Sequence, residues 1–383
     1  MKMIKYNIQS KLIFYYLALI LFLLLTNEYF DYQESIINGA ADGQAYFNIS
    51  NSFPKIADQQ MASIHSERFF FYYIFGFLSK ISNFEIFYIY RFFVFFILIS
   101  INIILILILK KKKIDLNIIL FFLTLVNLNP YMSRFYIAAP SVLNDLIFIF
   151  GLTLFLYSVE NNKTKILIYS LIILFFSRQT SVAIILSLIL TKFTYQEKFI
   201  FTKKKIFFMI LLCVFIYLIN YQYSENTFKS GDLRWELYSP KMRLFGYFLQ
   251  DVNIKEKLIF LILPLLSFFP LIMYFLIFRK LKKIQFSLPT DPKIFFYFLI
   301  SLFIIFQPIL SGVSVTGRNI IRLTTLSYIV VLYLLLNFTT VRKLKNKSIG
   351  VFFYLFIIFW SFHPTFSNIK VFEPFAMILK KNF

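Results

Sequence analysis

The first long polar segment of the chain contains a stretch of small residues, Asn38 to Tyr46, that carries one acid, Asp42. Gly39 and Gly43 flank this acid, and glycine lets a backbone take left-handed conformations and approach a ligand closely. Tyr46 follows four residues later, one turn away if the segment is helical. A carboxylate held in such a loop can accept a proton from a hydroxyl group, which is general-base chemistry. The competing interpretation is an ordinary solvated loop acid.

Cations that suit phosphate occur on the same predicted side of the chain. Arginine binds phosphate through a planar, two-pronged fork. The candidates are Arg68, Arg178, Arg318 and Arg322. We favour Arg178 and Arg318, because Gly317 beside Arg318 permits close backbone approach. The alternative for any one of these arginines is a contact with a lipid headgroup.

One acid and several arginines suit a particular reaction. Hydrolysis of a glycosidic bond takes two carboxyl groups, because a poor leaving group must be protonated. A phosphate leaving group is already a stable anion, so one base and a few cations suffice. His65 is a candidate to hydrogen-bond sugar or phosphate, with a plain surface histidine as the alternative. Trp235 is a candidate sugar-stacking face, with an interfacial anchor as the alternative.

Four charged residues lie in apolar surroundings: Arg91, Asp145, Arg178 and Arg322. Arg178 and Arg322 are also among the phosphate-binding candidates. Each of the four charges would cost roughly 2.5–3.5 kcal/mol at the centre of a membrane helix. They must therefore lie near the water interface, where long side chains reach solvent, or face one another in a wet cavity.

Composition indicates the class of protein that holds these residues. The 383 residues are 59% hydrophobic, 21% aromatic and only 15% charged, with a mean hydropathy of +0.74. A soluble domain averages about 25% charged residues, so the sequence predicts a polytopic membrane protein. The net charge of +22 sits in short basic connections between apolar spans, which is the positive-inside pattern and argues against a nucleic-acid partner. One cysteine, Cys213, forms no internal disulfide, and two histidines are too few for a His-rich zinc site.

The apolar spans predict an all-α integral membrane fold of about eleven transmembrane helices, with the N-terminus inside. Residues 1–383 are predicted to form a single membrane domain without a separate soluble domain. Residues 31–83 are predicted as a long first outer loop, in which 69–81 form a helix that lies in the interface or spans. Residues 221–257 are predicted as a second outer loop, and 129–134 as a short outer turn. Most of the acids fall on the outer side, which suggests a polar working face there.

The order of these features resembles the GT-C superfamily of polytopic glycosyltransferases. The resemblance covers about residues 10 to 195 and rests on short motifs. These are Ala41-Asp42-Gly43-Gln44-Ala45-Tyr46, His65-Ser66-Glu67-Arg68 with the following aromatic run, Arg91, and Ser177-Arg178-Gln179-Thr180. The resemblance implies that Asp42 is the essential acid of the first outer loop, and that the Arg178-Gln179-Thr180 turn belongs to the site. No second acid adjoins Asp42, as it does in some members, so we expect no metal.

The resemblance implies transfer of a sugar from a polyprenyl-phosphate carrier to an acceptor hydroxyl at the outer face of a plasma membrane. The acceptor would be lipid- or protein-linked, and no cofactor is expected beyond the lipid-linked donor. Asp42 would be the base, the four arginines would bind phosphate, and Tyr46, His65, Gln179 and Trp235 would contact sugar or acceptor.

Two other functions stay open. A polysaccharide polymerase or ligase of the O-antigen type would depend on arginines of the second outer loop, such as Arg234 and Arg243. A transporter or flippase of lipid-linked glycans would show repeated halves and polar residues near the bilayer midplane, which the sequence does not display.

Overall fold

The computed structural model describes residues 2–37, 42–57, 63–196, 199–227, 262, 264–282, 291–311, 317–337 and 347–362. Every regular element in these residues is a helix. The predicted all-α class is therefore confirmed for the described part of the chain.

The first half of the chain runs α1 (Lys2–Thr26), α2 (Tyr32–Ile37), α3 (Asp42–Ser52), α4 (Ser63–Ser66), α5 (Phe69–Ser82), α6 (Ile86–Lys111), α7 (Leu116–Asn127), α8 (Ser133–Ala138), η1 (Pro140–Val142), α9 (Asn144–Asn161) and α10 (Thr164–Ser177). The second half runs η2 (Gln179–Ser181), α11 (Val182–Tyr195), α12 (Lys203–Thr227), α16 (Pro264–Ser267), α17 (Phe269–Lys282), α18 (Pro292–Ser311), α19 (Gly317–Thr324), η4 (Thr325–Ser327), α20 (Tyr328–Asn337) and α21 (Lys347–Ser361).

Several helices begin and end where local chemistry requires it. Asp31 and Glu34 form a capping box before α2, in which each side chain accepts from the backbone N–H of the other, at 2.7 and 2.9 Å. The carboxylate of Asp115 caps α7 by accepting from the N–H of Asn117 at 3.1 Å. Asn83 and Asn162 end α5 and α9 in the left-handed conformation that terminates helices.

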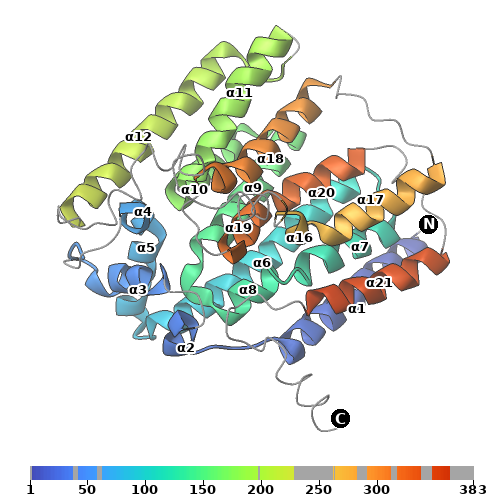
Figure 1. The fold of residues 1–383 in the computed structure, drawn as a ribbon, viewed down its shortest axis with the longest axis horizontal. Coiled ribbons are helices and arrows are strands. Elements are labelled where there is room, and N and C mark those ends of the chain that lie inside the picture. The colour runs from blue at the N-terminus through green and yellow to red at the C-terminus, as the bar shows by residue number, and fades with distance from the viewer. Residues whose placement is uncertain are drawn as a thin grey trace.

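The long helices run up and down in an antiparallel bundle, so that alternate connections lie at the same end (Figure 1). At one end Glu160 lies 3.8 Å from the amine of Lys112 and 3.5 Å from that of Lys293. We call this the lysine end. Asp42 and Arg322 meet at the opposite end, which we call the site end.

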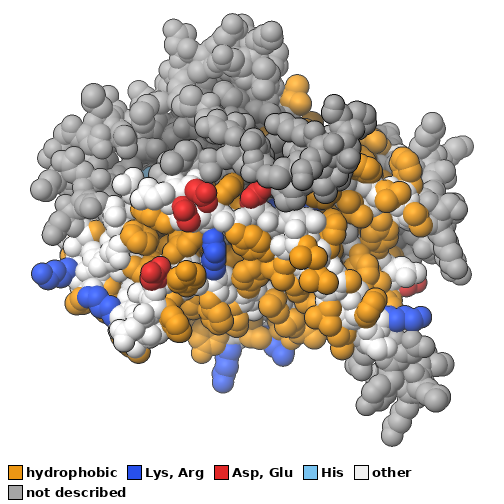
Figure 2. Space-filling model, turned by 90° about the horizontal axis from the view of Figure 1, so that it is seen from below, with side chains coloured by type: hydrophobic (Ala, Val, Ile, Leu, Met, Phe, Trp, Pro, Cys, Tyr) orange, Lys and Arg blue, Asp and Glu red, His pale blue; other side chains and the backbone are white. Residues whose placement is uncertain are grey.

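Helix α9 lies at the centre of the bundle, in contact with α6, α10 and α20. It is apolar on all sides and buried along almost its whole length, as expected for a helix surrounded by others. The outer helices instead present large apolar side chains to the surroundings, such as Phe92 of α6 and Phe207 of α12, which are 64% and 69% exposed. Figure 2 shows such apolar side chains covering much of one face of the molecule.

Two of the described helices, α6 and α12, are long and apolar enough to cross a membrane by length and composition. Shorter apolar helices of 10–17 residues include Leu116–Asn127, Thr164–Ser177 and Pro292–Pro308.

Two segments predicted as outer loops are more ordered than expected. The predicted loop 31–83 contains α2 to α5, and α12 continues to Thr227, past the predicted start of the second loop at 221. The segment predicted as a short outer turn at 129–134 is buried, since Asn129 is 0% and Arg134 is 1% exposed. Arg134 donates to the carbonyl of Thr26 at 2.9 Å, which ties this segment to the end of α1. The sequence of a polar segment between apolar spans is compatible with exposure or with burial. The contacts of Arg134 with the end of α1 determine that this segment is buried.

Helices α3 and α5 cross with their backbones in close approach at Gly76. A Cβ added there would lie 2.0 Å from the carbonyl oxygen of Ser50. The hydroxyl of Ser50 also donates to the carbonyl of Tyr72 at 2.7 Å. This crossing fixes the helix on which Asp42 lies.

We predict that Gly76→Ala lowers the stability of the protein by at least about 1–3 kcal/mol, the usual cost of overpacking. Thermal unfolding of the purified protein in detergent measures this as a fall of the melting temperature by several degrees. Gly350→Ala is the matched control, because no atom lies within 4 Å of the Cβ position at this other helical glycine. Equal melting temperatures for the two variants would contradict the close crossing.

Candidate functional site

Asp42 lies in the first turn of α3, where the positive end of the helix dipole favours a negative charge. Gly43 packs directly on Ser141, since a Cβ at residue 43 would lie 2.3 Å from the Oγ of Ser141. The glycine beside Asp42 therefore permits a close approach, as the sequence suggests, and here it is an approach to another part of the chain. Gly39 lies outside the described residues.

Two cationic or titratable side chains face the carboxylate of Asp42. Its Oδ1 lies 3.8 Å from Nε2 of His65, and its Oδ2 lies 3.9 Å from an Nη of Arg322. Both distances exceed those of a hydrogen bond, so the carboxylate and the guanidinium keep hydrogen-bonding capacity for a third group. The side chain of Asp42 is 42% exposed, whereas those of His65 and Arg322 are 14% and 9% exposed. Asp42 thus forms the open edge of a largely buried polar cluster.

A second acid, Asp145, lies behind Arg322. Its Oδ2 is 3.4 Å from Nε of Arg322, and its Oδ1 accepts a hydrogen bond from Nη1 of Arg178. Asp145 is buried, at the start of α9, and Arg178 is buried between α10 and η2. One carboxylate therefore lies between two guanidinium groups that come from distant parts of the sequence.

Tyr46 organises a third part of the site. Its hydroxyl accepts from Nη1 of Arg68 at 3.0 Å and lies 3.5 Å from Nδ1 of His65. Its ring stacks on that of Tyr72 with centroids 4.3 Å apart. Tyr46 is only 2% exposed, and its contact with sugar or acceptor stays a prediction. It lies one helical turn beyond Asp42 and faces inward, where it holds Arg68 and His65.

Gln179 links this part of the site to the turn between α10 and α11. Its Oε1 accepts from Nε of Arg68 at 3.1 Å, and its Nε2 donates to Glu67 at 2.6 Å. The predicted outer turn at Arg178 to Thr180 and the segment that ends at Arg68 therefore lie side by side at the site end.

Several buried polar atoms around Asp145 have no hydrogen-bond partner within the described part of the chain. They are Oδ2 of Asp145, Nε of Arg178, Nε of Arg322, both side-chain atoms of Asn144 and the hydroxyl of Tyr136. A buried unsatisfied polar group costs about 1–3 kcal/mol, so native structures rarely gather them without a reason. Their concentration next to the open edge at Asp42 marks the place where a polar ligand would supply partners.

The protonation states follow from this environment. Burial among neighbouring side chains would raise the pKa of Asp42, but the charge of His65 when that ring is protonated, together with the charges of Arg322, Arg68 and Arg178, lowers it by more. Burial lowers the pKa of His65, and the three arginines add to this, while Asp42 opposes it. Near pH 7 Asp42 is therefore an ionised carboxylate and His65 a neutral imidazole.

Of the residues predicted from sequence for the site, this cluster contains seven: Asp42, Tyr46, His65, Arg68, Arg178, Gln179 and Arg322. Arg322 joins the cluster through its ion pairs with Asp42 and Asp145. Arg318 lies on α19 one helical turn before Arg322, and its side chain is outside the described part of the structure, as is the whole of Trp235. Arg91 lies elsewhere and donates to the carbonyl of Phe30 at 2.6 Å.

Sequence reasoning did not assign Asp145, Glu67, Asn144 or Tyr136 to the site. Asp145 did carry a signal, because an acid at the start of an apolar span must find a partner. Asn144 and Tyr136 carried none, since uncharged polar residues are tolerated in apolar helices.

Among the residues that the structure describes, no group of three or more His, Cys, Asp or Glu side chains is placed to hold a metal ion. Comparison of the chain with protein-family models, with curated proteins and with solved structures finds no match. The geometry of the site is therefore the basis for the function proposed below.

We predict that Asp145→Asn destabilises the protein by about 3–5 kcal/mol, because it leaves buried arginine charge uncompensated. The double variant Asp145→Asn/Arg178→Gln is expected to recover part of that loss, which a double-mutant cycle of thermal unfolding measures. Asp115→Asn is the control, since asparagine caps a helix as well as aspartate does and the variant should be neutral. Strictly additive effects of the two substitutions would show that the pair is not coupled.

The lowered pKa of His65 predicts a pH-dependent stability. The unfolded chain binds a proton at His65 near pH 6.5, whereas the folded protein resists it until a lower pH. Stability that is present above about pH 6.5 is therefore lost as the pH falls toward 5. His65→Gln removes this linkage, so the melting temperature of the variant should fall less between pH 8 and pH 5 than that of the wild type. Parallel pH profiles would show that His65 titrates normally in the folded protein.

Proposed function

We propose that the protein is an integral membrane glycosyltransferase that moves a sugar from a polyprenyl-phosphate carrier to an acceptor hydroxyl. Asp42 is the general base and Arg322 binds the phosphate of the donor. The observation that carries this proposal is the half-exposed carboxylate of Asp42, 3.9 Å from a guanidinium that Asp145 backs from the other side.

The membrane placement that we propose has about eleven spans, with the lysine end in the cytoplasm and the site end at the outer face. It is supported by the exposed apolar side chains of the outer helices and by the two helices long enough to cross. Monomeric soluble proteins rarely expose such large apolar areas. It is also supported by Lys110, Lys111, Lys112 and Lys113 at the end of the bundle opposite the site.

The proposed reaction balances without an acid catalyst. The acceptor oxygen forms a bond to the anomeric carbon of the sugar and gives its proton to Asp42. The bond from that carbon to the phosphate oxygen breaks, and the electron pair leaves on the polyprenyl phosphate. Attack from the side opposite to the phosphate inverts the anomeric centre. A lowered pKa suits this role, because Asp42 stays ionised and ready to accept a proton at neutral pH.

The remaining residues of the cluster orient these two groups. Arg178 is bound to Asp145 and buried, so in this proposal it supports Asp145 and Arg322, and Arg322 makes the direct contact with phosphate. In this proposal the neutral ring of His65 hydrogen-bonds the sugar or the acceptor beside Asp42. Tyr46, Arg68 and Gln179 hold His65 and the start of α5 in place.

We predict that Asp42→Asn lowers transfer by about 10²–10⁴-fold, the usual contribution of a positioned base. Arg322→Gln is predicted to lower it by about 10²–10³-fold, the usual contribution of a charge-stabilising donor. The assay follows release of polyprenyl phosphate from a panel of radiolabelled polyprenyl-phosphate hexoses, with purified protein in detergent and a lipid-linked oligosaccharide as acceptor.

Glu225→Gln is the control, because Glu225 is an exposed acid near the site end of α12. Near-normal turnover of a folded Asp42→Asn variant would remove Asp42 from the mechanism. Detergent solution contains no compartments, so a protein that only moved lipid-linked sugars across a membrane would release no product in this assay.

A further inference from the structure

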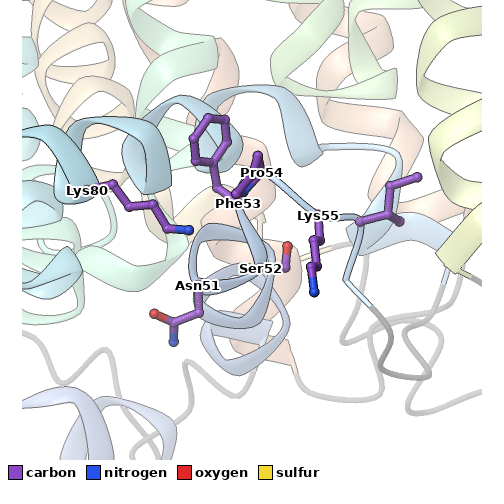
Figure 3. Close-up of a pocket in the computed structure, with 7 residues that line it drawn as sticks. Asn51, Ser52, Phe53, Pro54, Lys55 and Lys80 are labelled. Atoms are coloured by element: carbon purple, nitrogen blue, oxygen red, sulfur yellow. The ribbon is translucent and has the colours of Figure 1, made fainter.

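A hollow of about 330 Å³ opens at the surface where α3 ends and the chain turns toward α4. Its lining includes Asn51 and Ser52 at the end of α3, Phe53, Lys55 and Ile56 from the turn that follows, and Lys80 from α5. In Figure 3, Lys80 and Lys55 lie on opposite sides of Ser52. The volume is at the lower end of the range of small-molecule sites, about 300–1,000 Å³.

The lining of this hollow is positively charged. Lys55 and Lys80 belong to different elements, both are exposed, and the described lining contains no acid. The carboxyl ends of α3 and α5 each carry about half a negative charge from the helix dipole. The two lysines together carry two positive charges, and the two helix ends together carry about one negative charge, so about one unit of positive charge remains in the hollow.

The close packing of α3 on α5 brings the lysines together. Gly76 meets the backbone of Ser50, and Lys80 follows Gly76 by one helical turn. The amine of Lys80 lies 5.8 Å from the ring centre of Phe53, which is within the range of a cation–π contact. The position of Lys80 in the hollow is therefore set by the helix crossing.

The surface beside the hollow is apolar. Phe77, Ile81 and Phe84 are 44%, 65% and 66% exposed on the end of α5 and the turn into α6, and Ile56 at the rim is 40% exposed. Lysines next to exposed aromatic and aliphatic side chains are typical of segments that lie at the interface between lipid and water. A ligand that matches both features has an anionic head and an apolar tail.

We propose that this hollow binds the phosphate headgroup of an anionic membrane lipid, with Lys55 and Lys80 on the phosphate and the apolar surface of α5 along the acyl chains. It is separate from the candidate active site, because α3 has 11 residues and places Asp42 about 15 Å away. A lipid bound there would hold the far end of α3 at the outer membrane surface. The inference rests on the membrane placement proposed above, and it does not depend on the transfer reaction.

The test uses the full chain in detergent micelles, titrated with short-chain phosphatidylglycerol, short-chain phosphatidylcholine or inorganic phosphate. Each lysine near a lipid surface contributes about a fivefold factor in affinity. Lys55→Gln/Lys80→Gln should therefore weaken phosphatidylglycerol binding about 30-fold, and each single variant about fivefold. Lys163→Gln/Lys165→Gln is the matched control, since both of those lysines are exposed at the lysine end.

Wild-type preference for phosphatidylglycerol over phosphatidylcholine, lost in the double variant and kept in the control, supports the site. Unchanged binding by a double variant with a wild-type melting temperature would overturn it. Competition by inorganic phosphate at the same concentration as the lipid would also overturn it, because it would indicate a site for a soluble anion. The assay measures no transfer, so an inactive enzyme that binds the lipid leaves this inference standing.

Discussion

A charge removed from water must find a partner, and the site end of the bundle is arranged around one such partner, Asp145. Its carboxylate lies between Arg178 and Arg322, so three separate segments, the start of α9, the turn before η2 and helix α19, must converge. The cost of an isolated buried charge makes this convergence a condition of folding. Arg322 also lies beside Asp42. Of these four charged side chains, Asp42 is the one that is substantially exposed.

At the lysine end, too, a largely buried acid is paired with cations, but there the acid also has a hydrogen-bond partner that carries no charge. There Glu160 lies between Lys112 and Lys293, accepts from the hydroxyl of Tyr297 at 3.2 Å, and its backbone carbonyl accepts from Lys111 at 2.7 Å. One acid between two cations again joins distant helices, and Glu160 is not among the groups left without a partner. Around Asp145, by contrast, several buried polar atoms make no hydrogen bond within the described part of the chain, and they lie beside the exposed carboxylate of Asp42. That difference distinguishes a cluster that only joins helices from one that is suited to a ligand.

Close backbone contacts hold helix α3, and with it Asp42, in position. Gly43 lets the start of α3 rest on Ser141, and Gly76 lets its far half rest on α5. The hydroxyl of Tyr72 then donates to the carbonyl of Ser141 at 2.8 Å, and its ring supports that of Tyr46. Helix α3 is thus held along its length, with the candidate active site at one end and the lysine-lined hollow at the other. A lipid bound in that hollow would act on the same helix that carries Asp42.

The amino-acid sequence alone determined the helical class and the need for Asp145, Arg178 and Arg322 to find partners. Long apolar runs favour helices, and a charge in apolar surroundings is costly wherever it lies in the chain. It also indicated Asp42 and its glycine neighbour. Only the tertiary structure decided which charges pair, that Arg91 bonds to a backbone carbonyl instead, and that Tyr46 faces inward. It also decided that the turn at 129–134 is buried. These outcomes depend on which helix faces which, and the competing arrangements differ by a few hydrogen bonds between residues far apart in the sequence, which no local pattern records.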